Sequence, residues 1–472
     1  MIPATTFAGR RVAVFGLGLS GVAAARALQA GGADVLAWDD GEAARAKAEA
    51  AALALHDLAA ADWTGIAALV LAPGVPLTHP EPHWSVRKAH DAGVEVIGDT
   101  ELFFRERAKA SSRAKVVVIT GTNGKSTTTA LTAHLLEAGG KRVALGGNIG
   151  RAVLELPPFA DDLVYVLELS TFQIDLTPSL APNAAALLNI TPDHLDRHGT
   201  IENYAAIKAR IFNGLPANGT AVIGVDDPYS RVIADGLRGA FAVKRIAIAH
   251  PVKTGVWAED GVLIEVEDGM EQARTSLAGI GSLRGAHNWQ NAATAYALAR
   301  SQGLDAAAIA KGLRSFAGLA HRMEQVGRSG RVLFVNDSKA TNADAAGKAL
   351  ASFDTIYWIV GGRPKAGGLS GLEPYFPKIA RAYLIGEASD QFAEQLGDAV
   401  EYMKCGTLDQ AVAQAAADAA CSSAEEPVVL LSPACASYDQ FANFEARGES
   451  FRKIVMDLKG VEPVARHEGR AA

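Results

Sequence analysis

The run from residue 115 to residue 127 constrains the fold more than any other part of this sequence. It reads Lys-Val-Val-Val-Ile, followed by Thr-Gly-Thr-Asn-Gly-Lys-Ser-Thr. The apolar half predicts a buried strand, and the residues after it predict a glycine loop that opens a helix. In such a loop Gly121 and Gly124 let backbone N–H groups approach an anion. Lys125 supplies a charge for phosphates, and the Ser126 hydroxyl can bind Mg²⁺. The run therefore predicts a P-loop-type α/β domain that binds ATP or GTP.

Composition and charge exclude several other classes of protein. The chain has 472 residues, of which 49% are hydrophobic and 21% charged, as in a soluble globular protein of several domains. A net charge of −7 argues against a nucleic-acid binder that relies on a basic surface. The three cysteines fit neither a disulfide framework nor a zinc site. Without a signal pattern or an apolar run of roughly 18 residues, we expect a cytoplasmic protein with no membrane partner.

Apolar runs alternate with helical stretches in three blocks, which predicts a three-domain α/β fold. We expect a Rossmann-like N-terminal domain at 1–110, a P-loop-type central ATPase domain at 111–318 and a Rossmann-like C-terminal domain at 319–472. The last residues, from about 460, are expected to be frayed. The predicted strands are 11–15, 34–38, 67–71 and 94–97 in the first block, 115–120, 142–145, 163–169, 184–190, 220–223 and a hairpin at 256–266 in the second, and 332–335, 355–360, 381–385 and 427–431 in the third.

A second glycine run follows the first predicted strand. Gly16-x-Gly18-x-x-Gly21, with Asp39 eighteen positions after Gly21, is similar to a dinucleotide-binding fingerprint. The run alone indicates the diphosphate of a nucleotide without selecting NAD. Because an ATP-type loop follows in the next block, a nucleotide-diphosphate substrate is a credible occupant.

Polar clusters follow four of the predicted strands in the second and third blocks. Ligands of open parallel sheets bind at the carboxyl ends of the strands, so the clusters predict a site built from both blocks. Glu168 and His194 are the candidate Mg²⁺ ligands, with Ser126 as a further oxygen donor. The four clusters begin at Glu168, Asn189, Asn336 and Ser432.

These motifs, taken in order, resemble the ATP-dependent Mur ligases of peptidoglycan synthesis. Within that family, the N-terminal and C-terminal runs are most similar to the member that joins D-glutamate to UDP-N-acetylmuramoyl-L-alanine. The runs that carry the resemblance are 16–21, 121–127, 146–150, 167–170, 193–194, 287–288 with Asn291, 321–322, 336–342 and 432–441 with 443–448.

The resemblance implies a reaction and a set of roles. The family phosphorylates the carboxylate of its substrate with ATP, and an amine then attacks the acyl phosphate. It implies ATP, two Mg²⁺ ions and a carbamate formed from CO₂ on Lys208. We expect a monomer, because the sequence has no exposed coiled-coil pattern. Lys125, Glu168, His194 and Lys208 would be the catalytic residues. The metal would be held by Ser126, Glu168, His194 and carbamylated Lys208. The ATP site would comprise Gly121, Thr122, Asn123, Gly124, Lys125, Ser126, Thr127, Asn288, Asn291, Arg322 and Asp337. The UDP-sugar would contact Ser20, Asp39, Gly74 and Asn148, with Gln173 nearby, and Ser170 would also bind substrate. D-glutamate would contact Lys339, Thr341, Lys365, Ser437 and Phe444.

The sequence departs from the pattern of that member at two places. We expect an arginine two positions after the aspartate that ends the second strand, but the run is Asp39-Asp-Gly-Glu42, and the first arginine is Arg45. Arg363 and Pro364 also replace other residues before Lys365. Uridine contacts in the first loop and the role of Lys365 are therefore open.

Three alternatives remain at this point. A sister ligase for L-alanine, a diamino acid or folate would share the phosphate loop, and only the first and third blocks discriminate against it. A nicotinamide-dependent oxidoreductase would use the first block but leaves the phosphate loop unexplained. A non-catalytic nucleotide sensor would be expected to lack Lys125, Glu168 or His194, and all three are present.

Overall fold

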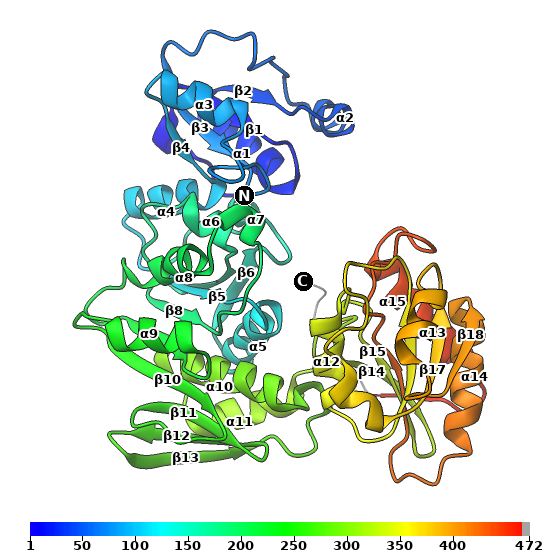
Figure 1. The fold of residues 1–472 in the computed structure, drawn as a ribbon. Coiled ribbons are helices and arrows are strands. Elements are labelled where there is room, and N and C mark those ends of the chain that lie inside the picture. The colour runs from blue at the N-terminus through cyan, green and yellow to red at the C-terminus, as the bar shows by residue number, and fades with distance from the viewer. Residues whose placement is uncertain (465–472) are drawn as a thin grey trace. The chain divides into compact units, whose positions relative to one another are not determined.

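The computed structural model describes residues 1–464 as a mixed α/β protein with three sheets (Figure 1). This confirms the predicted fold class. In the described residues, no helix is long and apolar enough to cross a membrane.

The helices and strands follow one another along the chain largely as predicted. The α-helices are α1 (Leu19–Ala30), α2 (Glu42–Ala50), α3 (Trp84–Asp91), α4 (Asp99–Lys109), α5 (Lys125–Ala138), α6 (Thr171–Asp175), α7 (Leu195–His198), α8 (Ile201–Ala209), α9 (Pro228–Gly236), α10 (Ala286–Ser301), α11 (Ala306–Ser315), α12 (Ala343–Ala351), α13 (Ser389–Leu396), α14 (Leu408–Ala420) and α15 (Phe444–Asp457). Short 3₁₀ helices are η1 (Thr5–Phe7), η2 (Val153–Glu155), η3 (Arg210–Phe212), η4 (Gly281–Leu283) and η5 (Glu373–Lys378). The strands are β1 (Arg11–Phe15), β2 (Asp34–Trp38), β3 (Ile66–Leu71), β4 (Glu95–Ile97), β5 (Lys115–Thr120), β6 (Arg142–Gly147), β7 (Leu163–Glu168), β8 (Ala184–Leu187), β9 (Thr220–Gly224), β10 (Ala242–Ile248), β11 (Gly255–Glu259), β12 (Val262–Glu267), β13 (Met270–Ser276), β14 (Glu324–Ser329), β15 (Val332–Asn336), β16 (Ile356–Gly361), β17 (Ile379–Ile385), β18 (Tyr402–Gly406), β19 (Val428–Leu431) and β20 (Glu462–Pro463).

The first sheet has the order β2-β1-β3-β4, and all its pairings are parallel. Its four strands are those predicted, within one residue at their ends. β1 ends at Phe15 and β2 ends at Trp38, so the glycine run and Asp39 emerge at the same edge of the sheet. A ligand of this domain is expected at that edge.

The central sheet has the order β13-β12-β11-β10-β9-β8-β5-β7-β6. β5 pairs in parallel with both β7 and β8, which places the phosphate loop between the loops that follow these two strands. The predicted hairpin is confirmed as antiparallel β11 and β12, with Asp260 and Gly261 at φ of 48° and 73°. The prediction of a strand over 184–190 was too long. β8 ends at Leu187, because the chain then turns to place Asn189 against the phosphate loop.

The third sheet has the order β18-β17-β16-β19-β15-β14-β20, parallel from β18 to β15 and antiparallel at β14 and β20. The expectation of a frayed end from about residue 460 was wrong for Glu462–Pro463, which pairs with β14. The rest of that expectation, at 465–472, lies outside the described residues.

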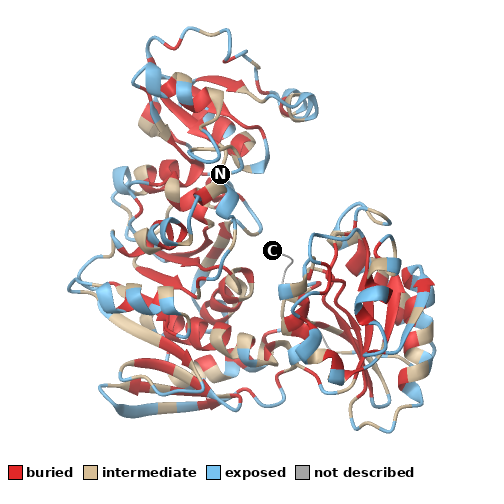
Figure 2. Ribbon diagram, in the orientation of Figure 1, coloured by how far each residue is buried: buried red, intermediate tan, exposed pale blue. Residues whose placement is uncertain are grey.

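The three sheets belong to two compact units. Residues 1–276 with 289–314 form the first unit, and residues 277–288 with 315–464 lie in the second. Most strand residues of each sheet are buried (Figure 2).

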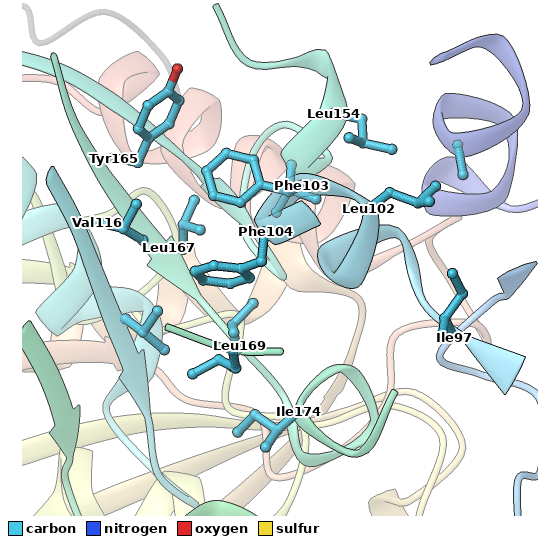
Figure 3. Packing of buried hydrophobic residues seen from close by; sticks show 14 of the residues in the cluster. Ile97, Leu102, Phe103, Phe104, Val116, Leu154, Tyr165, Leu167, Leu169 and Ile174 are labelled. Atoms are coloured by element: carbon cyan, nitrogen blue, oxygen red, sulfur yellow. The ribbon is translucent and has the colours of Figure 1, made fainter. Parts of the chain in front are cut away.

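Helix α4 joins the first two sheets inside the first unit. Its Leu102, Phe103 and Phe104 pack with residues of the central sheet in a cluster that also includes core residues of the first sheet (Figure 3). The ring of Phe103 lies 5.2 Å from that of Tyr165 on β7. The first two sheets therefore share one hydrophobic cluster.

Candidate active site

The phosphate loop has the backbone geometry that its glycines predict. β5 ends at Thr120 and α5 begins at Lys125, with Gly124 between them at φ 84°. A Cβ atom on Gly124 would lie 2.2 Å from Oδ1 of Asn291, and one on Gly121 would lie 2.9 Å from Cβ of Leu188. Both positions therefore exclude side chains, so the loop backbone can close around an anion at the N-terminus of α5.

Lys125 folds back over this loop. Its Nζ donates hydrogen bonds to the carbonyl oxygens of Gly121 at 3.0 Å and Thr122 at 2.7 Å. The ammonium group is thus held at the loop where phosphates are expected. Ser126, the next residue, is buried at the first turn of α5.

Asn189, which follows β8, holds the phosphate loop in place through hydrogen bonds. The backbone N–H of Asn123 donates to Oδ1 of Asn189 at 2.9 Å, and the N–H of Thr122 donates to its carbonyl oxygen. Sequence reasoning gave Asn189 no individual role. Its position directly after a strand beside β5 was the signal that could have identified it.

Asn291 reaches the same loop from α10. Its Oδ1 accepts a hydrogen bond of 3.1 Å from Oγ1 of Thr128, and both side chains are buried. Asn291 therefore lies beside the phosphate loop. Asn288 belongs to the second unit, where its Nδ2 donates to the carbonyl oxygen of Arg284 at 2.9 Å.

Glu168 ends β7 and is fully enclosed, with 1% of its surface exposed. Its Oε1 accepts a hydrogen bond of 2.8 Å from Nδ2 of Asn148, while its buried Oε2 has no hydrogen-bond partner. A shielded carboxylate oxygen without a donor is costly unless a cation or a donor binds there. Since Ile119 of β5 pairs with Glu168 in register, this oxygen belongs to the edge that carries the phosphate loop.

His194 lies at the N-terminus of α7 in a left-handed conformation, at φ 52°. Its Nε2 is 3.4 Å from Oδ2 of Asp193, and its ring meets the edge of Phe172 at 5.2 Å. About half of its side chain is exposed. The imidazole is therefore oriented by its neighbours but accessible to a ligand.

Lys208 is buried, with 1% of its surface exposed. Its Nζ donates to the carbonyl oxygen of Gly121 at 2.8 Å and lies 4.5 Å from the centre of the Tyr204 ring. Burial, and then the charge of Lys125, lower the pKa of Lys208 well below its ordinary value. No carboxylate among the described residues lies within 4 Å of this Nζ. The sequence alone does not distinguish Lys208 from a solvated helix lysine.

The side chains at this edge fit Mg²⁺ better than a transition metal. No group of three or more His, Cys, Asp or Glu side chains in residues 1–464 is arranged to bind a metal ion. Mg²⁺ needs few protein ligands, because phosphate and water oxygens supply the others. The unpartnered Oε2 of Glu168 and the hydroxyl of Ser126 are suitable hard donors.

Ser170 and Gln173 form a capping box at the start of α6. The N–H of Gln173 donates to Oγ of Ser170 at 3.3 Å, and the N–H of Ser170 donates to Oε1 of Gln173 at 3.0 Å. The spacing Ser-x-x-Gln carries this signal in the sequence. These two predicted substrate residues thus also hold the loop after Glu168 in place.

In the N-terminal domain, Asp39 connects the two loops at the edge of the first sheet. Its Oδ2 accepts from the N–H of Leu17 and its Oδ1 from the N–H of Gly41, each at 2.7 Å. Ser20 lies in the first turn of α1. Arg45 turns back toward this edge, where Nη1 donates to the carbonyl oxygens of Asp39 and Asp40 and the guanidinium lies 4.8 Å from the Trp38 ring. Arg45 therefore places a guanidinium at the end of β2, although it does not stand at the sequence position where we expect the arginine.

The second unit gathers several of the remaining predicted residues around β15. Asp337 is buried, with Oδ2 accepting from Oγ of Ser432 at 2.8 Å and Oδ1 from the N–H of Met323 at 3.1 Å. Burial raises the pKa of Asp337 to about 7. Nζ of Lys339 lies 3.8 Å from the centre of the Phe444 ring.

Arg322, Thr341, Lys365 and Ser437 also lie in this unit. The N–H of Thr341 donates to the carbonyl oxygen of Lys339 at 2.8 Å, Ser437 is buried, and Lys365 is exposed. Arg447, which sequence reasoning left without a role, is buried and donates to the carbonyl oxygens of Ser338 and Cys435. It joins the loops that carry these predicted residues.

Comparison with known proteins agrees with this geometry. Residues 119–299 match the Mur ligase middle domain, and residues 321–435 match the Mur ligase glutamate ligase domain. The chain is 59% identical over 463 residues to a UDP-N-acetylmuramoylalanine--D-glutamate ligase of Chelativorans sp. (strain BNC1), covering 98% of both chains. It is 57% identical over 462 residues to the enzyme of that name from Rhizobium meliloti (strain 1021), covering 98% of this chain and 99% of the relative.

Solved structures show the same fold at low sequence identity. The UDP-N-acetylmuramate-alanine ligase MurC from Thermotoga maritima aligns with a TM-score of 0.57 at 17% identity, over 94% of this chain and 98% of that one. MurF from Acinetobacter baumannii aligns with a TM-score of 0.55 at 18% identity, over 75% and 80% of the two chains.

Proposed function

The chain belongs to the Mur ligase family, and from that membership we propose that it joins D-glutamate to UDP-N-acetylmuramoyl-L-alanine, with conversion of ATP to ADP and phosphate. The relatives that carry this activity in their names match nearly the whole chain, including the first and third blocks that distinguish sister ligases. The product is a peptidoglycan precursor.

The chemistry follows from the weakness of a carboxylate as an electrophile. Phosphorylation gives the carboxyl carbon a phosphate leaving group, and the amine of D-glutamate then displaces it to form the amide. This reaction needs alignment and charge stabilisation of an in-line phosphoryl transfer. Lys125, held over the loop by Gly121 and Thr122, is suited to contact the β- and γ-phosphates.

The observation that carries the proposal is the buried, unpartnered Oε2 of Glu168 beside the phosphate loop. Ser126 and Glu168 would hold one Mg²⁺ near the phosphates, and His194 would help to hold a second. The ions would neutralise charge on the transferring phosphoryl group.

Lys208 belongs to the same proposal as the site of a carbamate. A carbamate from CO₂ would turn the buried lysine into a carboxylate-like oxygen donor for the second Mg²⁺. In support, its Nζ is enclosed beside Gly121, its pKa is depressed, and no carboxylate of the described residues pairs with it. A neutral amine is the form that reacts with CO₂.

The remaining assignments concern substrate recognition. For ATP we propose the loop residues 121–127 with Asn288, Asn291, Arg322 and Asp337. For the UDP-sugar we propose Ser20, Asp39, Gly74, Asn148, Ser170 and Gln173. For D-glutamate we propose Lys339, Thr341, Lys365, Ser437 and Phe444, which supply the cations and donors that two carboxylates need.

The domain boundaries 1–110, 111–318 and 319–472 are also part of the proposal, as are a monomeric state and a cytoplasmic location. The three sheets support the division, since each expected domain contains one of them. Light scattering of the purified protein at working concentration tests the monomer.

Phosphate release tests the function directly. The purified protein is supplied with ATP, Mg²⁺ and UDP-N-acetylmuramoyl-L-alanine, and D-glutamate, L-glutamate and L-alanine are compared. We expect release with D-glutamate alone. Phosphate release with another amino acid would keep the assignment to the family but change the assigned amino-acid substrate. No phosphate release with any of the three would contradict the assignment as a ligase.

A further inference from the structure

Arg197 lies where the N-terminal and central domains of the first unit meet. It belongs to α7, three residues after His194. Its Nη1 donates a hydrogen bond of 2.9 Å to the carbonyl oxygen of Gly74, in the loop that follows β3 of the first sheet. One guanidinium therefore joins the loop of His194 to a loop at the edge of the first sheet.

The rest of the guanidinium is held against an aromatic ring. Its carbon lies 4.8 Å from the centre of the Phe172 ring, which also meets the His194 ring at 5.2 Å and stacks on His198 at 5.1 Å. Phe172 belongs to α6, directly after the loop of Glu168. Its ring fixes the plane of Arg197 relative to His194.

Some hydrogen-bond donors of Arg197 have no acceptor, and its charge has no carboxylate partner among the described residues. Its Nε is shielded from solvent without a hydrogen-bond partner, and its Nη2 donates to no described residue. No carboxylate among residues 1–464 lies within 4 Å of the guanidinium, although Asp193 and Asp196 are close in sequence. A fixed cation with spare donors is a binding group for an acceptor oxygen.

The proposed substrate would span the same two sheet edges that Arg197 connects. Its diphosphate is expected at the glycine loop of the first sheet, and its reacting carboxylate at Lys125, Glu168 and His194 of the central sheet. The sugar and its acyl chain, which carry several carbonyl oxygens, connect these two ends. Arg197 is tied to both edges, so the connecting part of the substrate lies within its reach.

Resting on the proposed function, we propose that Arg197 binds a carbonyl oxygen of the muramoyl-alanyl part of the substrate and thereby holds the reacting carboxylate beside His194. Arg197 is then a substrate-binding residue that contacts the muramoyl-alanyl part of the substrate and does not contact the nucleotide. The hydrogen bond to Gly74 and the Phe172 ring fix its orientation before the substrate arrives, which limits the entropy lost on binding.

A comparison of the full substrate with UDP, which lacks the sugar and acyl chain, distinguishes a substrate-binding role of Arg197 from a purely structural one. Calorimetric titration measures the affinity of UDP and of UDP-N-acetylmuramoyl-L-alanine for the unmodified protein, Arg197→Met and Arg197→Lys. In Arg197→Met we expect the full substrate to bind about tenfold or more weakly, as for loss of a charged hydrogen bond. UDP should bind within about twofold of normal. Arg197→Lys should fall between, because it keeps the charge without the planar fork.

A matched control is Arg231→Met on α9. Arg231 also donates to a backbone carbonyl, that of Val225 at 3.0 Å, but α9 follows β9, away from the loops of Glu168 and Gly74. This variant should bind both ligands normally. Equal weakening of UDP and the full substrate in Arg197→Met would overturn the inference, since Arg197 would then act only through the Gly74 loop. Unchanged binding of the full substrate would also overturn it. If the unmodified protein binds neither ligand, the proposed function itself fails.

Discussion

Nζ of Lys208 donates a hydrogen bond of 2.8 Å to the carbonyl oxygen of Gly121, so a buried lysine connects helix α8 to the first residue of the phosphate loop. Lys125 donates to the same carbonyl oxygen at 3.0 Å. Two lysine Nζ atoms thus meet at one backbone acceptor, where burial and then repulsion by the charge of Lys125 lower the pKa of Lys208. A negative charge on Lys208, as in a carbamate, would remove this repulsion.

Lys208→Ala is expected to lower turnover by about a hundredfold or more, because a charged group at the phosphoryl-transfer site is lost. Short-chain carboxylic acids should restore part of the activity by placing a carboxylate where the carbamate would lie. Phosphate release is measured with and without added acid. Lys311→Ala, an exposed helix lysine, is the control and should behave normally. A fully active Lys208→Ala that does not respond to acid would show that Lys208 is only a helix residue.

Lys125→Ala should reduce turnover by about a thousandfold or more while the chain stays folded. The reason is that its ammonium group is held at the loop by two carbonyl oxygens and carries the charge expected to face the phosphates. Steady-state phosphate release and circular dichroism are compared with those of Lys141→Ala, an exposed lysine after α5. Near-normal turnover in Lys125→Ala would refute the assignment of the phosphate loop.

Glu168→Gln should separate activity from stability. The amide keeps an oxygen for Asn148 but removes a buried negative charge, one oxygen of which has no partner. We therefore expect an unchanged or higher unfolding temperature. Turnover should fall by about a hundredfold or more, and half-maximal turnover should need more Mg²⁺. Magnesium titrations and thermal unfolding test this, with the exposed Glu155→Gln as control. A normal magnesium requirement would exclude Glu168 as a ligand.

Asp337 should make the stability of the second unit depend on pH. Burial raises its folded-state pKa to about 7, above the value of about 4 in an unfolded chain. The folded state therefore holds a proton that the unfolded state releases between these values, so this contribution is complete below about pH 4 and is lost as pH rises to about 7.

In Asp337→Asn this dependence should disappear, so the variant gains stability relative to the parent protein as pH rises from about 4 to 7, by on the order of 4 kcal/mol. Denaturant unfolding at several pH values, followed by circular dichroism, measures the difference. A stability difference that is constant with pH would contradict the raised pKa.

The strands that sequence reasoning found and missed differ in burial. β5, β7 and β19 are continuous apolar runs buried in the interior of their sheets, so their pattern is unmistakable. β13 is polar and mostly exposed, and it lies at the edge of the central sheet, where no second neighbour demands apolar residues. β10, β14 and β18, with charged or small polar residues within them, were missed for a related reason.

The candidate site shows the same division. The phosphate loop and Glu168 were predictable because a motif and a strand end define them locally. The partners of Lys208 and Arg197, which are Gly121 and Gly74, lie 87 and 123 positions away in the sequence. Such pairings arise from tertiary packing, and a local pattern of residues does not contain them.

Because helix α4 packs against both of the first two sheets, the protein is expected to have fewer independently unfolding units than sheets. Since Phe103 and its neighbours fill a hydrophobic cluster common to the first two sheets, neither sheet can lose its core without exposing apolar surface of the other. The backbone bond from the N–H of Gly98 to the carbonyl oxygen of Leu176, at 2.9 Å, adds to this dependence. The two sheets, to which we assign nucleotide-sugar recognition and phosphoryl transfer, would then unfold together in one cooperative transition. A ligand of either sheet would protect both from heat and proteolysis.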